Sequence, residues 1–131
     1  MEKKKLFLLS VFVMLFTLTV NAQAPGIKFE SDVHDFDSIQ EKDGVVTATF
    51  EFVNDGNAPL IIYNVSASCG CTALDWTREP VPVNGKGFIK VSYNPKNRPG
   101  LFAKSVTVKS NASERPVVLQ IKGVVVLQKN N

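Results

Sequence analysis

The chain reads VTATFEF at residues 46–52, and this stretch decides the fold class. Its apolar residues fall at every second position, from Val46 to Phe52, and threonine or glutamate fills the positions between them. Alternation with a period of two is typical of a half-buried β-strand, because successive side chains point to opposite faces of a sheet. Asp43-Gly44 before the stretch and the polar run at residues 54–57 after it predict a turn at each end.

Similar short segments follow along the chain and are separated by turn residues. We expect further strands at residues 27–29, 36–39, 60–67, 88–93, 102–109 and 117–127. The segment 73–87 contains Pro80 and Pro82 and predicts a loop instead. About seven short strands at these spacings predict an all-β, immunoglobulin-like sandwich, in which two sheets bury their apolar faces against each other.

Residues 1–22 have the three-part pattern of a secretory signal peptide. Three lysines at 3–5 precede an apolar run over 6–20, and small residues follow it. Cleavage after Ala22 is favoured, because cleavage after Ala24 would place Pro25, which lacks an N–H, next to the cut bond. A retained membrane anchor is the alternative, but the run of about 15 residues is shorter than the roughly 20 that span a bilayer. We therefore expect a leader over 1–22 and one domain over 23–131, exported to the periplasm or beyond the cell and soluble after cleavage.

The charge of the mature part is nearly balanced. Residues 23–131 carry 12 basic and 11 acidic side chains, so the excess of positive charge in the whole chain belongs largely to the leader. A formal charge of +1 gives no indication of binding to nucleic acid or to an anionic membrane surface. No later apolar run is long enough to span a membrane, so we expect no transmembrane segment in the mature chain.

Cys69 and Cys71 are the only cysteines, and Gly70 alone separates them. On a regular strand their Cα atoms would lie roughly 6.6 Å apart, near the upper limit for a disulfide. Gly70 permits a bend that would bring the sulfur atoms together. A disulfide in such a small ring would be strained and easily reduced, although an oxidising compartment favours its formation.

Other roles for the two cysteines stay open. Two thiolates on one face suit Cu(I) better than zinc, which would need two further ligands in a chain whose only imidazole is that of His34. Thiol–disulfide exchange is a second possibility, although the Cys-x-x-Cys spacing and helix N-terminus of thioredoxin-like enzymes are missing. Simple packing is a third, because cysteine behaves as a small apolar residue that would continue the inward face of the strand before it.

Three further features are candidates for a site. Trp76, the only tryptophan, is expected either to cap one end of the core or to form a partly exposed contact with a partner. His34 is expected to lie at a strand edge beside Phe36 rather than to bind a metal. Several carboxylates precede the strand at 46–52, and their spacing matches no calcium loop, so we expect a solvated acidic edge: Asp32, Asp35, Asp37 and Glu41.

Several phrases of the sequence occur together in one protein family. They are His34-Asp35-Phe36, the run from Phe52 to Leu60, Ser68-Cys69-Gly70-Cys71-Thr72, Tyr93-Asn94-Pro95 with Arg98-Pro99-Gly100, and the run from Leu119 to Gly123. In these phrases the chain resembles an exported bacterial family of unknown function that is marked by a Cys-Gly-Cys-Thr motif. That family is similar to the immunoglobulin-like modules of the hydin and major-sperm-protein types. The resemblance covers Phe29 to Gly123 and implies the sandwich fold and export, without an activity. Asp37 departs from the pattern, since relatives commonly carry glycine there.

The sequence predicts a binding or assembly module of the bacterial cell envelope rather than an enzyme. It shows neither a glycine-rich phosphate loop nor a serine nucleophile elbow, and we expect no cofactor. Another envelope protein is the expected partner, and partner strands can add to exposed sheet edges. The alternative is an envelope thiol-redox or Cu(I)-handling protein that uses Cys69 and Cys71.

Overall fold

The computed structural model describes residues 22–68 and 71–127 of the 131-residue chain. Residues 1–21 of the predicted leader lie outside this part. No helix within the described ranges is long and apolar enough to cross a membrane. The described elements, in chain order, are β1 (Lys28–Phe29), β2 (Val33–Gln40), the short 3-10 helix η1 (Glu41–Asp43), β3 (Val46–Val53), β4 (Ile62–Ala67), β5 (Cys71–Trp76), β6 (Lys86–Tyr93), β7 (Gly100–Ser110) and β8 (Ser113–Val126).

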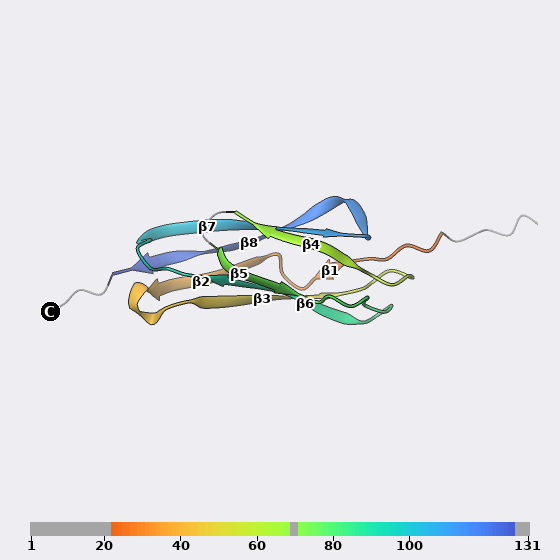
Figure 1. Cartoon of the computed structure of the whole chain (residues 1–131), viewed down its shortest axis with the longest axis horizontal. Helices are drawn as coiled ribbons and strands as arrows, with labels where there is room; N and C mark the ends of the chain where they lie inside the picture. The colour runs from red at the N-terminus through yellow and green to blue at the C-terminus, as the bar shows by residue number, and fades with distance from the viewer. Residues whose placement is uncertain (1–21, 69–70, 128–131) are drawn as a thin grey trace, which may run out of the picture.

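The strands form two four-stranded sheets that pack face to face (Figure 1). One sheet has the order β1-β3-β6-β5, and the other has the order β2-β8-β7-β4. All neighbouring strands are antiparallel except β2 and β8, which are parallel. These orders match the ABED and CFG sheets of an immunoglobulin-like domain, with the first strand divided between the two sheets. The predicted immunoglobulin-like β-sandwich is confirmed.

The strand predictions hold in type, but two of their details are wrong. The loop predicted over 73–87 begins too early, because β5 continues to Trp76 and pairs with β6 through Trp76↔Ile89. The eight strands are the seven that were predicted and β5, and the two predicted short strands are β1, which pairs with β3, and β2, which pairs with β8 in the other sheet. Several strands are also longer than predicted, most clearly β8, which begins at Ser113.

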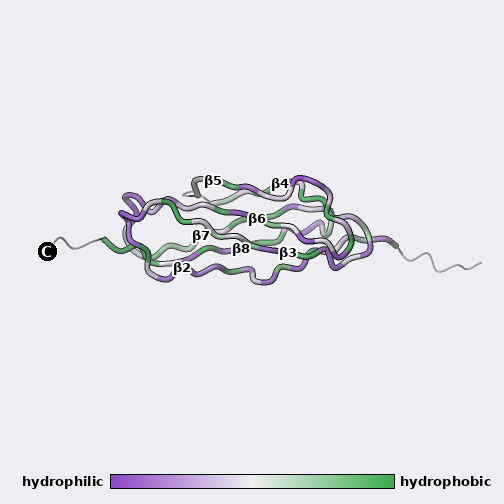
Figure 2. Tube along the Cα trace, turned by 90° about the horizontal axis from the view of Figure 1, so that it is seen from below, coloured by the Kyte–Doolittle hydropathy of each residue, from purple (hydrophilic) through white to green (hydrophobic). Residues whose placement is uncertain are grey.

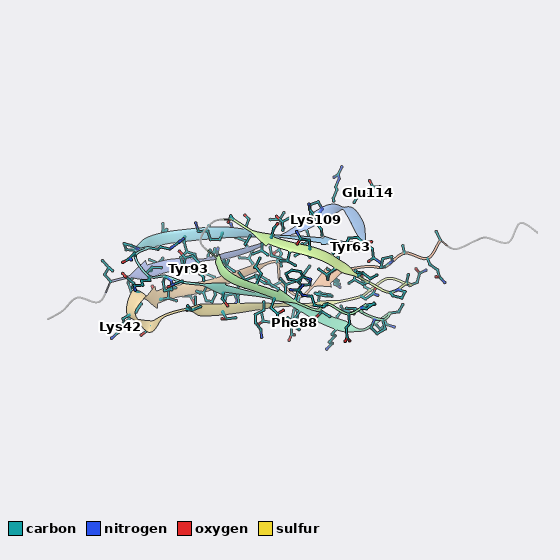
Figure 3. The ribbon with its side chains drawn as sticks, in the orientation of Figure 1. Lys42, Tyr63, Phe88, Tyr93, Lys109 and Glu114 are labelled. Atoms are coloured by element: carbon teal, nitrogen blue, oxygen red, sulfur yellow. The ribbon has the colours of Figure 1, made fainter. Side chains whose placement is uncertain are left out.

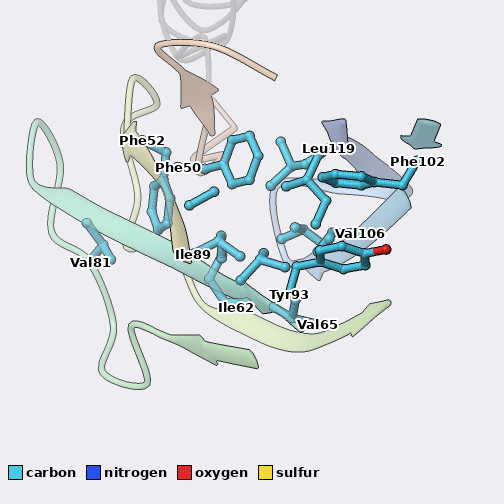
Figure 4. Packing of buried hydrophobic residues seen from close by; sticks show 14 of the residues in the cluster. Phe50, Phe52, Ile62, Val65, Val81, Ile89, Tyr93, Phe102, Val106 and Leu119 are labelled. Atoms are coloured by element: carbon cyan, nitrogen blue, oxygen red, sulfur yellow. The ribbon is translucent and has the colours of Figure 1, made fainter. Parts of the chain in front are cut away.

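The core lies between the sheets and follows the alternation of the sequence. Hydrophilic and hydrophobic residues alternate along several strands (Figure 2). On β3, Ala48, Phe50 and Phe52 are buried, whereas the residues between them are exposed. The rings of Tyr93 and Phe102 stack with their centroids 4.2 Å apart and join the two sheets (Figure 4). Each large apolar side chain buried in this way contributes about 1.5–3 kcal/mol to stability.

Asn54 is the only buried polar residue within the described ranges, and its side chain forms four hydrogen bonds. Its Nδ2 donates to the carbonyl oxygens of Ala58 at 2.8 Å and Val81 at 3.0 Å. Its Oδ1 accepts from the N–H groups of Gly26 at 3.1 Å and Gly56 at 3.0 Å. This uses the full capacity of the amide, and it joins the segment before β1, the turn after β3 and the loop before β6.

Replacement of Asn54 by alanine should lower the free energy of unfolding by about 3 kcal/mol, because it leaves several buried backbone groups without a partner. Asn57→Ala is the matched control. Its Oδ1 accepts one exposed bond, from the N–H of Ala24 at 2.6 Å, so its loss should cost under about 1 kcal/mol. Urea denaturation followed by Trp76 fluorescence measures both variants. Equal losses would contradict the special role of Asn54.

Candidate functional site

The two cysteines lie where the chain crosses from one sheet to the other. β4 ends at Ala67 as an outer strand of one sheet, and β5 begins at Cys71 as an outer strand of the other sheet. Cys71 therefore begins a strand of the other sheet and does not continue β4. Cys69 and Gly70 lie outside the described residues, and of Cys71 only the backbone is described. The backbone of Cys71 lies opposite Tyr93 on β6.

Hydroxyl side chains hold the C-terminal ends of both outer strands, and of the two only the end of β4 lies next to this crossing. Ser68 follows β4: its N–H donates to the carbonyl of Ser105 at 3.0 Å, and its Oγ accepts from the N–H of Ser105 at 3.1 Å. Thr77 follows β5 and has the same arrangement with Phe88, at 3.1 Å and 3.0 Å. In each case the hydroxyl takes the place of the backbone carbonyl as the acceptor in the ladder. Ser68 thus fixes the chain immediately before Cys69.

Trp76 is half-buried at the end of β5 and packs against the core. The guanidinium carbon of Arg78 lies 3.4 Å from the centre of the Trp76 ring and covers its outer side. The backbone N–H of Trp76 donates to Oδ1 of Asp75 at 2.9 Å. This position suits both predicted roles, since the ring is anchored in the core and its outer side is covered by a single exposed arginine.

His34 lies on β2 beside Phe36, as predicted. The two ring centroids are 4.4 Å apart, and His34 also approaches Phe50 of the opposite sheet at 6.5 Å. Its ring therefore belongs to the aromatic packing between the sheets. Within residues 22–68 and 71–127, no group of three or more His, Cys, Asp or Glu side chains is placed to hold a metal ion.

The predicted acidic edge runs from Asp32, in the bend before β2, through Asp35 and Asp37 of β2 to Glu41 of η1. Asp35 approaches Lys122 of β8 at 4.0 Å, and its Oδ1 accepts from the N–H of Asp37 at 2.8 Å. Asp37 has a φ of 57°, and the pairing of β2 with β8 is interrupted at this bulge. Glu41 accepts from the N–H of Asn97 at 3.0 Å. Asp35 and Glu41 thus have separate partners rather than a common centre.

An open groove of ≈ 680 Å³ lies beside the bulge at Asp37. Leu101, which is 87% exposed, and Gly123 are among the residues that line it. A Cβ at Gly123 would lie 2.9 Å from the ring of Phe102 and 3.0 Å from the carbonyl oxygen of Asp37. The glycine therefore allows the bulge of β2 to approach β8 closely.

The sequence prediction missed one feature that concerns binding. β1 covers only the end of β3, at Val53 and Phe52, and the chain then passes to the other sheet. The polar residues Ser31 and Asp32 between the two predicted short strands are the sequence signal of this change of sheet.

Residues 27–125 match the family described as protein of unknown function, DUF1573. The chain belongs to this family. The match confirms the predicted resemblance to a family of unknown function over nearly the same residues. The similarity to hydin-type and major-sperm-protein-type modules stays a prediction. No match was found among curated proteins.

Solved structures share the fold of this DUF1573 chain. A protein of unknown function from Porphyromonas gingivalis W83 is 16% identical with a TM-score of 0.66, over 83% of this chain and 50% of that one. The secreted serine protease VesC from Vibrio cholerae is 14% identical with a TM-score of 0.60, over 76% of this chain and 23% of that one. The Vibrio cholerae protease VesB is 11% identical with a TM-score of 0.55, over 86% of this chain and 35% of that one. The chain thus spans half or less of the length of these structures.

The positive φ of Asp37 predicts that Asp37→Gly stabilises the protein by about 0.5–1 kcal/mol, because only glycine adopts this region without a steric cost. Ser38→Gly is the matched control: Ser38 does not have a positive φ, so the change should destabilise by a similar amount. Asp37→Asn separates the loss of charge from the relief of the backbone. Thermal and urea unfolding measure all three variants, and a loss of stability in Asp37→Gly would contradict the prediction.

Proposed function

We propose that this DUF1573 protein is an exported, non-catalytic binding or assembly module of the bacterial cell envelope. The observation that carries the proposal is the set of uncovered sheet edges. β1 and β5 are the outer strands of one sheet, β2 and β4 are those of the other, and no described strand pairs with their outer sides. Such edges offer N–H and C=O groups to which a partner can add a strand.

Export is supported by the leader pattern over residues 1–22, which favours cleavage after Ala22. The similarity to a part of VesC, a secreted protease, adds that a module of this fold occurs in a secreted protein. In this role Trp76 is the candidate for a partner contact, because its ring is anchored in the core behind the exposed Arg78. The partner that the proposal implies is another envelope protein.

The proposal predicts that the chain, expressed with its leader, is recovered outside the cytoplasm. Its measured mass should be that of a chain whose first residue is Gln23. A photo-crosslinking residue should form a discrete protein adduct from at least one of three positions: Thr49, on the part of β3 that β1 leaves uncovered, Tyr63 on β4, or Arg78 after β5. Lys122, which is exposed on β8 between its two neighbours β2 and β7, is the matched control and should give none. Retention of an uncleaved chain in the cytoplasm, or a lack of adducts from all three edge positions, would contradict the proposal.

The second candidate is an envelope thiol-redox or Cu(I)-handling protein. The observation that favours it is the placement of the cysteines on one short link between two held ends. Ser68 is fixed to Ser105 before the link, and the backbone of Cys71 lies opposite Tyr93 after it. With Cys69 and Cys71 only two positions apart in the sequence, a link between two held ends suits reversible disulfide formation or two-coordinate Cu(I) binding.

A variant with Cys69→Ser and Cys71→Ser separates the two candidates. For a binding module we expect the edge adducts to persist and only the stability to fall. For a thiol protein we expect a stably folded variant that has lost reduction of insulin disulfides or binding of Cu(I). The mass of the parent protein after alkylation shows how many of the two cysteines are free thiols. Two labelled cysteines in the exported protein would exclude a disulfide between them.

A further inference from the structure

Half of β3 has a neighbour on one side only. β6 pairs with all of β3, from Val46↔Tyr93 to Val53↔Lys86. On the other side, β1 pairs with Phe52 and Val53, and the N–H of Glu30 donates to the carbonyl of Glu51 at 3.2 Å. The chain then leaves this sheet and continues as β2 beside β8. No described strand therefore pairs with residues 46–50 of β3 on the side of β1.

The register shows which backbone groups face this gap. Along an antiparallel strand, successive residues bond alternately to the neighbours on either side. The backbone N–H of Asn54 donates to the carbonyl of Gly85 at 2.9 Å, so even-numbered residues of β3 bond to β6. The carbonyl of Glu51 accepts from Glu30, so odd-numbered residues bond toward the side of β1. Thr47 and Thr49 are alternate residues in the same series as Glu51, so they bond toward the same side. Their backbone N–H and C=O groups thus face the gap and could accept an added strand.

The inner side of the gap is aromatic. His34 and Phe36 of β2 are half-buried, and the His34 ring reaches Phe50 of β3 at a centroid distance of 6.5 Å. Val45, at the end of the gap, is 53% exposed. In an added strand, residues opposite Ala48 and Phe50 would point inward, where apolar side chains would extend this packing.

The surroundings of the gap are strongly acidic. Residues 30–43 contain six carboxylates and one lysine, a formal charge of −5, whereas residues 23–131 as a whole carry +1. Asp35 and Glu41 have the partners described above. Glu30 and Glu51 lie at one end of the gap, and Asp43 lies in η1 at the other end. Lys42, the middle residue of η1, is labelled in Figure 3. Lys28 of β1 and Lys90 of β6, which pairs with Thr49, reduce this negative charge but do not balance it, so complementarity favours lysine and arginine in a segment that enters the gap.

We infer that the open edge of β3 binds an extended basic segment of a partner protein, which continues the line of β1 as an added antiparallel strand. Apolar residues of the segment, opposite Ala48 and Phe50, pack against the aromatic floor. Basic residues alternate with them and lie on the outer face, within reach of the flanking carboxylates. This inference rests on the proposed function and narrows it to one edge and one class of partner.

Two synthetic peptides with blocked ends test the inference on the full chain: one alternates lysine and valine over seven residues, and the other alternates glutamate and valine. The lysine peptide should slow amide hydrogen exchange at Thr47 and Thr49 at least tenfold and bind at least tenfold more tightly than the glutamate peptide. Added salt should reduce the difference in affinity between the two peptides. Equal binding of the two peptides, or protection at another edge instead, would overturn the inference.

Thr49→Pro removes the N–H that faces the gap, in a position where an edge strand tolerates proline. It should weaken binding of the lysine peptide at least tenfold, whereas the matched control Thr49→Val should stay within twofold. If Thr49→Pro does not fold, a double variant with Glu30→Gln and Asp43→Asn should weaken binding and reduce its salt dependence. Binding of the lysine peptide as tight as in the parent protein, by a folded Thr49→Pro variant or by the double variant, would overturn the inference.

Two other outcomes separate this inference from the proposed function. Protection of Thr47 and Thr49 that rises with protein concentration, without peptide, would show that a second copy occupies the edge and would overturn the basic-partner inference. Envelope adducts that persist in a folded Thr49→Pro variant would retain the module but assign its contact to another edge. A lack of adducts at every edge would reject the module itself, whatever the peptides do.

Discussion

The sandwich depends on the four hydrogen bonds of one buried amide. Asn54 lies at the end of β3, where three irregular segments meet, and its side chain supplies the partners that their backbones would otherwise lack. The segment before β1 is held there, so β1 is delivered to the edge of β3. The same amide holds the loop before β6 through Val81. One side chain thus sets where two strands of the sheet begin.

The sequence predicted the regular parts of the fold, because alternation such as that of residues 46–52 depends only on which side chains are buried. It could not predict that Asn54 is buried, since asparagine is a common residue of exposed turns. β5 was missed because the prolines that follow it and the charge at Asp75 are typical of a loop. The candidate residues were predicted one by one, but the open edge of β3 depends on pairing between distant segments, which no local pattern contains. Asp37 is an intermediate case: the family pattern indicated glycine, and the positive φ provides the reason.

The early change of sheet has two opposite effects. It places His34 and Phe36 between the sheets, where they cover part of the core at the edge of the sandwich. It also leaves Thr47 and Thr49 without a neighbouring strand on one side. Natural proteins often protect such edges with charge. The carboxylates around the gap are consistent with that protection, and the same charge would select which segments can approach.

The parallel pairing of β2 with β8 determines how the domain responds to tension. The chain enters β2 at Val33 and leaves β8 after Val126, and the two ends of the domain lie at opposite ends of its long axis (Figure 1). A force that pulls the ends apart first loads the short pairing of β1 with β3 and then acts along β2 and β8 in opposite directions. The hydrogen bonds between them are loaded together in shear rather than opened one after another. In a tether between two envelope components, this ladder would be the element that resists extension.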